Sequence, residues 1–207
     1  MKKPLRHRPT SSHIKRRALS GCGIIVLCAF VAAFAAAAVV VAGQGDTAPG
    51  EYQVKAAILY NFAKFVEWRV DAFSHPSSPI VIGILGDDPF GSAFEAVKDK
   101  LIKGRKVQVL RSGKERDLSR CHVLFISSSE RGRLSSILTE LEGSRALLVS
   151  DIGKFAVRGG MIGLVMRNDM VDFEINVDAV QRAGIRISER LLNTARIIRE
   201  AQPEKNK

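Results

Sequence analysis

Residues 51–68 (EYQVKAAILYNFAKFVEW) gather much of the aromatic content of this chain into a stretch without glycine or proline. The segment holds both tyrosines, the only tryptophan and two of the ten phenylalanines. Val54, Ile58, Phe62 and Phe65 recur at three- and four-residue spacing, and Leu59 and Val66 widen the stripe. This pattern predicts an amphipathic helix with a broad buried face. Helices this aromatic usually pack on a sheet, so we expect the two phenylalanines to be structural.

Two polar side chains of the predicted helix are not explained by a role in the core. Asn61 and Lys64 lie among apolar neighbours. They are therefore candidates for a surface that binds a partner or a ligand.

The first 42 residues have the pattern of an export signal. Residues 1–19 carry seven cations and no anion, and residues 21–42 carry no charged side chain. A basic segment followed by an apolar run is typical of a signal peptide, and the small residues at its end place cleavage after Ala42 or Gly43. The apolar run also suits an uncleaved transmembrane anchor, since about 20 residues span a bilayer. Both interpretations put the following domain outside the cytoplasm.

Composition limits the possible domain organisation and partners of residues 43–207. Residues 43–50 are rich in turn-forming residues and predict a flexible linker, followed by one domain over 51–201 and a polar tail over 202–207. The chain has a net charge of +11, but the export segment carries seven of the cations, which leaves +4. Nucleic-acid binding loses its main support, and we expect no nucleic-acid partner. Cys121 is the only cysteine after residue 42, so the core must hold the domain together without a disulfide.

The remaining pattern predicts an α/β fold, with a mostly parallel sheet flanked by helices. Continuous apolar runs indicate strands buried on both faces. Two further strands around Arg167 to Met170 predict a C-terminal antiparallel hairpin. The expected strands are 79–85, 106–110, 121–126, 146–149, 161–166 and 171–177. The expected helices are one that carries Phe94, Val97 and Leu101 inward, and those over 130–141, 178–183 and 188–200.

Few side chains after residue 42 could do catalysis or bind a metal. His75 and His122 are the only histidines there. His122 lies in an apolar strand beside Cys121, where neighbours point to opposite faces, so we expect a hydrogen-bonded structural histidine. No catalytic residue, metal site or cofactor is therefore expected.

Polar residues gather where the predicted parallel strands end, and ligands of such sheets bind at that edge. Asp87 and Asp151 are the candidate residues of a small-molecule pocket there. A phosphate ligand is disfavoured, because two successive carboxylates would repel it. Capping of the next helix by Asp87 or Asp88 is the alternative role.

On the second strand of the hairpin, side chains alternate between the two faces. Glu174 and Asn176 share one face, and Phe173 and Ile175 share the other. If the phenylalanine face is the core, the two polar side chains project toward solvent, a second helix or a partner. Hydrogen bonds within the fold would explain them equally well.

Five segments in order resemble the YfiR family of exported proteins, and together they cover nearly all of the predicted domain. They are VKAAILYNFAKFVEW, ILGDDPFG, CHVLFISSSE, SDIGKFAVRGGMIGLV and FEINVDAVQRAGIRISERLLNTARIIR. The resemblance implies a periplasmic, non-enzymatic α/β protein. The best-known members repress an inner-membrane diguanylate cyclase by binding its periplasmic sensor domain, and so control cyclic di-GMP and biofilm formation.

The chain departs from the family pattern in two places. The best-known members form dimers and carry disulfides, whereas Cys121 has no partner, which sets redox control of this fold in doubt. Arg69 follows Trp68 where the family pattern has proline.

Two functional hypotheses follow. The first is a periplasmic regulator that binds an inner-membrane signalling protein, of the diguanylate cyclase or histidine kinase type, with a homodimer as a further assembly. The second is a small-ligand sensor that uses the strand-end pocket, and both roles can coexist. An envelope enzyme ranks last, because no catalytic constellation is present.

Overall fold

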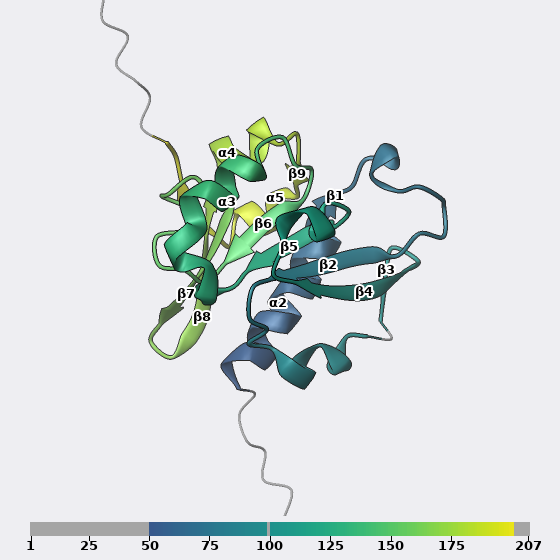
Figure 1. Ribbon diagram of the computed structural model, residues 1–207, viewed down its shortest axis with the longest axis horizontal. Coiled ribbons are helices and arrows are strands. Elements are labelled where there is room, and N and C mark those ends of the chain that lie inside the picture. Colours follow the sequence, from purple (N-terminus) through teal and green to yellow (C-terminus); the bar gives the residue numbers. More distant parts are fainter. Residues whose placement is uncertain (1–49, 99, 201–207) are drawn as a thin grey trace, which may run out of the picture. The chain divides into compact units, whose positions relative to one another are not determined.

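Figure 1 shows the domain in a computed structural model, which describes residues 50–98 and 100–200. The described residues all belong to one compact unit. The predicted export segment, its cleavage site at Ala42 or Gly43 and the polar tail over 202–207 lie outside the described residues. Among the residues described, no helix is both long and apolar enough to cross a membrane.

An eight-stranded sheet organises the domain, in the order β10-β8-β7-β6-β5-β2-β4-β3. The strands from β4 to β7 in this order pair in parallel, as do β8 and β10. The β7–β8 hairpin and the β3–β4 pair are antiparallel. The prediction of a mostly parallel sheet with a C-terminal hairpin is confirmed. The strands are β2 (Ile80–Leu85), β3 (Leu101–Ile102), β4 (Arg105–Ser112), β5 (Val123–Ile126), β6 (Leu147–Ser150), β7 (Ile162–Arg167), β8 (Met170–Asn176) and β10 (Arg196–Ile198).

Helices flank this sheet, as predicted. The α-helices are α2 (Glu51–Phe65), α3 (Leu134–Glu140), α4 (Val177–Arg182) and α5 (Glu189–Leu192). The 3-10 helices are η1 (Val70–Ala72), η2 (Gly91–Ala96), η3 (Glu115–Leu118) and η4 (Ser128–Arg133). In the sheet, β4 lies on one side of β2 and β5 lies on the other, so the connections β2–β4 and β4–β5 run in opposite directions across the sheet. Because such crossovers are right-handed, η2 and η3 lie on opposite faces of the sheet. Helix α2 packs beside η2.

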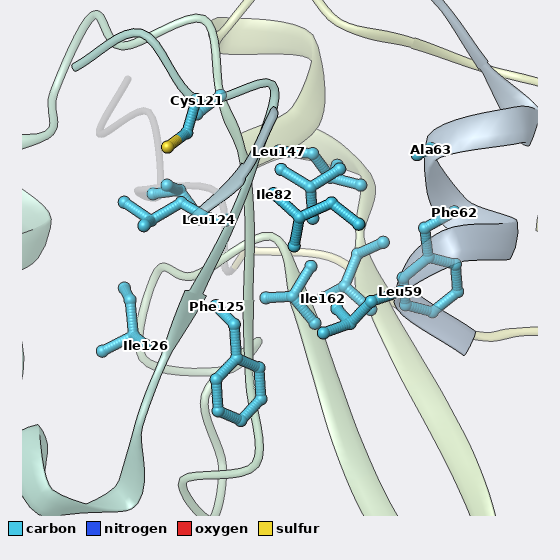
Figure 2. Packing of buried hydrophobic residues seen from close by; sticks show 14 of the residues in the cluster. Leu59, Phe62, Ala63, Ile82, Cys121, Leu124, Phe125, Ile126, Leu147 and Ile162 are labelled. Carbon is cyan, nitrogen blue, oxygen red and sulfur yellow. The ribbon is translucent and has the colours of Figure 1, made fainter. Parts of the chain in front are cut away.

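Leu59, Phe62 and Val66 are buried as predicted, but the buried face of helix α2 is rotated away from the rest of the predicted stripe. Its buried residues are Lys55, Ala56, Leu59, Phe62 and Ala63, whereas Val54, Ile58 and Phe65 are half-buried. Ala56 and Ala63 have small side chains, so on this face the helix backbone can lie close to the sheet. Figure 2 shows Leu59 and Phe62 directed from α2 toward Ile162 of β7.

The predicted helix over 188–200 is wrong in its second half. Helix α5 is one turn long, and β10 then joins the sheet edge in parallel with β8. Ile197 pairs with Ile175, and Ile198 pairs with Asn176. Two β-branched residues in sequence favour a strand once a partner strand is available, and this pairing overrides the helical spacing.

Two shorter features were also not predicted correctly. Phe94 and Val97 are buried as expected, but Leu101 is 56% exposed and lies in β3, where its neighbour Ile102 is buried. The first helix ends at Phe65, and the following β1 (Val66–Glu67) pairs with β9 (Arg186–Ile187) in a separate two-stranded sheet.

Candidate functional site

The strand-end residue Asp151 is engaged by α2. Its Oδ2 accepts hydrogen bonds from Lys55 Nζ at 2.6 Å and from the Tyr52 hydroxyl at 3.1 Å. Lys55 Nζ also pairs with Glu51 Oε1 and lies 4.4 Å from the centre of the Tyr52 ring. The predicted site residue therefore ties α2 to the end of β6.

At the end of β2, the side chains of Ser129 and Glu130 lie against Gly86 and Asp87. The amide of Asp87 donates to Ser129 Oγ at 3.0 Å, while its side chain is exposed. A Cβ added at Gly86, whose φ is +89°, would lie 2.7 Å from Glu130 Oε1. Asp88 makes the turn contact, because its Oδ1 accepts from the Phe90 amide at 2.8 Å. Asp87 and Asp151 thus contact different elements, Asp87 the start of η4 and Asp151 the helix α2.

Glu174 and Asn176 are buried and bonded inside the fold, so the alternative of hydrogen bonds within the fold is confirmed and projection toward solvent is wrong. Asn176 is fully buried, and its Oδ1 accepts from the Ala179 amide at 3.0 Å, which caps α4. Its Nδ2 donates to Ala156 O at 2.9 Å and to Glu200 Oε1 at 3.0 Å. Strand β8 is internal to the sheet, between β7 and β10, and its last three residues, Glu174, Ile175 and Asn176, are all buried.

Glu174 is held by two arginines from the neighbouring strands. Its Oε1 accepts from Arg167 at 3.0 Å and from Arg196 at 3.2 Å. The carboxylate is buried, while both guanidinium groups reach solvent. This cluster fixes the register of the three strands.

Asn61 and Lys64 remain accessible. Both side chains are exposed on the outer side of α2. Lys64 Nζ lies 5.7 Å from the centre of the Tyr60 ring, which also belongs to this helix. Of the four proposed partner-binding residues, these two keep an exposed side chain.

The prediction of a structural histidine is confirmed. His122 Nδ1 accepts from the Val81 amide at 3.1 Å, so Nε2 carries the proton and donates to Ala72 O at 3.1 Å. The ring stacks on Phe73 with centres 4.7 Å apart. Burial holds the pKa of His122 below its ordinary value, although the bond to Ala72 O opposes this shift. Burial also raises the pKa of the neighbouring Cys121 thiol to about 11.

A pocket of about 290 Å³ opens at the amino ends of the parallel strands, opposite the predicted edge. Its walls come from the segment after α2, from Arg145 before β6 and from the turn after α4. The lining is apolar at Val66, Ala72 and Ile185. The sheet brings together segments that lie far apart in the sequence.

Charged groups surround this amino-end pocket. Asp71 accepts from Arg69 Nε at 3.0 Å and from Arg145 at 2.8 Å. The bond from Arg69, with further help from Arg145, lowers the pKa of Asp71. Arg182 also lines the pocket and forms a two-bond pair with Glu200. Three guanidinium groups beside an apolar lining suit a small organic anion.

Sequence reasoning missed this pocket. Arg69, Arg145 and Arg182 are separated by long stretches of chain, and each alone resembles an ordinary solvated surface residue. The available signal was Arg69, which stands directly after the only tryptophan.

A sequence model of the family described as YfiR/HmsC-like matches residues 52–196. The match covers more than half of the chain, and it runs from the first turn of α2 to the first residue of β10.

Proposed function

The chain belongs to the YfiR/HmsC-like family, and from this premise we propose that it binds the periplasmic sensor part of an inner-membrane signalling protein. Family membership supports, in general terms, a non-catalytic periplasmic regulator of cyclic di-GMP signalling. The proposed partner is a membrane diguanylate cyclase, with a histidine kinase as the alternative output. The observation that carries this proposal is a family match that spans nearly the whole described domain.

The proposed contact surface begins with the exposed side of α2. Asn61 and Lys64 offer an amide and a cation there. The tip of the β7–β8 hairpin is a second contact element, because Met166 and Met170 are 48% and 68% exposed. Met166 pairs with Val171, and Met170 pairs with Arg167, so the two methionines lie on opposite faces of the hairpin. Exposed methionines adapt to varied apolar partners.

The experiment that tests this function has a genetic and a biochemical arm. Deletion of the gene should change cellular cyclic di-GMP, and in vivo crosslinking should recover a membrane signalling protein. Lys64→Glu should weaken binding to the sensor part of that protein without changing the circular dichroism spectrum. Lys154→Glu, an exposed cation on the turn after β6, is the matched control. Unchanged cyclic di-GMP and no membrane partner would refute the proposal.

The amino-end pocket supports small-ligand sensing as a second function. Its guanidinium groups and apolar lining match a small carboxylate with an apolar body. Titration with benzoate and succinate, followed by isothermal calorimetry, tests this. We expect Arg145→Gln to weaken benzoate binding more than Arg131→Gln, which alters an exposed arginine on η4. Equal affinities in both variants would exclude this site.

A further inference from the structure

Positive charge is concentrated in one segment of the domain. Residues 98–120 carry nine Lys and Arg side chains and three carboxylates. The rest of residues 43–207 carries 16 cations and 18 anions. The mature chain is therefore basic because of this segment alone.

The segment forms one end of the sheet. Strand β3 is the last strand beyond β4, and Figure 1 shows this pair well away from the β7–β8 hairpin. Leu101 of β3 pairs with Lys106 of β4, so both side chains lie on the same face. The 3-10 helix η3 contacts β4 and β2, and it brings Lys114 and Arg120 to this part of the sheet. We call Lys100, Leu101, Lys106, Lys114 and Arg120 the basic edge.

Some cations of residues 98–120 are bonded within the fold, whereas those of the basic edge form no ion pair among the described residues. Arg105 donates to Ser78 O at 2.8 Å, and Arg111 pairs with Asp88. Lys103 donates to Val66 O at 3.0 Å. In contrast, none of the ion pairs within the described residues includes the four cations of the basic edge, and all four side chains are exposed.

We propose that the basic edge docks the domain on an anionic phospholipid bilayer. Lysines act as point charges on flexible stems, so they are attracted to a negatively charged surface without a defined geometry. Leu101, 56% exposed among these cations, can enter the boundary between headgroups and acyl chains. A second copy of the chain would present the same positive charge and be repelled. This inference does not depend on the proposed signalling partner.

The test measures binding of a chain that begins at Gly43 to lipid vesicles, since the buried core of the described residues lies between Ala56 and Leu191. We expect co-sedimentation with vesicles of phosphatidylglycerol and phosphatidylethanolamine, but not with phosphatidylcholine alone. High salt should release the protein, because it screens surface charge. Each cation near an anionic surface changes the partition coefficient about fivefold. A variant with Gln in place of Lys100, Lys106, Lys114 and Arg120 should therefore lose detectable binding.

The matched control removes the same number of charges elsewhere. It carries Gln in place of Arg131, Lys154, Arg158 and Arg186, all of which are exposed. We expect this control to bind anionic vesicles far more tightly than the basic-edge variant. Equal loss in the two variants would show that net charge, rather than this edge, attracts the bilayer, and would overturn the proposal.

A fluorescence measurement locates the contact. Leu101→Trp should show a blue shift of indole emission with anionic vesicles, because the ring leaves water. Val157→Trp, at a position 60% exposed on the turn after β6, should show none. If wild-type protein ignores anionic vesicles while the basic-edge variant loses an acidic protein partner, the edge binds protein and the lipid proposal is wrong.

Discussion

Lys55 and Asp151 form a buried ion pair that joins the first helix to the end of a central strand. The two side chains are 4% and 9% exposed, and Nζ lies 2.6 Å from Oδ2. Lys55→Met leaves the buried Asp151 carboxylate without its counterion, so we expect the free energy of unfolding to fall by about 3 kcal/mol. Asp151→Asn leaves Lys55 paired with the exposed Glu51, so we expect a smaller loss. Urea unfolding measures the loss, and Lys154→Met is the exposed control. Additive effects in the double variant would contradict the pairing.

The same pair gives a pH prediction. Burial disfavours the charged form of Lys55, but hydrogen bonds to Asp151 and Glu51 outweigh this and raise its pKa above 10.5. The folded protein thus holds this proton more tightly than the unfolded chain does. The contribution of the pair to stability should be complete below pH 10 and lost as the pH rises through the folded pKa. Chemical denaturation between pH 8 and pH 11 should show a smaller decline for Lys55→Met.

His122 should make the fold sensitive to acid. Burial sets its folded pKa below the ordinary 6.5, and protonation of Nδ1 would remove the acceptor of the Val81 amide. The unfolded chain binds this proton at a higher pH, so stability is complete above pH 6.5 and falls as the pH drops toward the folded pKa. We expect His122→Gln to be less stable at pH 7.5, yet to lose less stability between pH 7.5 and pH 5. His75→Gln, at an exposed position, should retain the wild-type dependence.

Gly83 and Cys121 are in close contact inside the sheet. A Cβ added at Gly83 would lie 2.5 Å from Cys121 Sγ and 2.9 Å from Leu124 Cδ1, and Figure 2 shows these two side chains near one another. Gly83→Ala should therefore cost about 1–3 kcal/mol through overpacking. Cys121→Ala should recover part of that loss in the double variant, as judged by thermal melting. Gly113→Ala has open space around it and serves as control.

The sequence predicted the elements that have a strong pattern of their own. Continuous apolar runs identified β2, β5 and β6, and the turn around Asn168 and Asp169, with φ of 48° and 60°, identified the hairpin. The two-residue strands β1, β3 and β9 have no periodicity, so only tertiary pairing defines them. The apolar residues of β10 also fit a helical spacing, and only the pairing with β8 shows that they form a strand.

For the candidate sites too, local sequence predicts the position of a residue but not its tertiary contacts. The prediction that Asp151 lies at a strand end required only the order of elements along the chain. Whether that end is open or filled depends on Tyr52 and Lys55, which approach from the far end of the domain sequence. The amino-end pocket depends on three segments that lie far apart in the sequence, and no local pattern contains that information.

Asn176 is a candidate partner-binding residue that is buried and hydrogen-bonded in the structure. Its side chain caps α4 through the Ala179 amide and donates to Ala156 O, with no exposure to solvent. Asn176→Ala removes the cap and leaves the buried Ala156 carbonyl with only the long bond of 3.4 Å from the Gly159 amide, so we expect a loss of about 2–3 kcal/mol. Asn61→Ala, on the exposed side of α2, should change stability by less than about 0.5 kcal/mol. If Asn176→Ala unfolds at the same urea concentration as wild type, these hydrogen bonds do not stabilise the fold, and the structural role assigned to Asn176 is wrong.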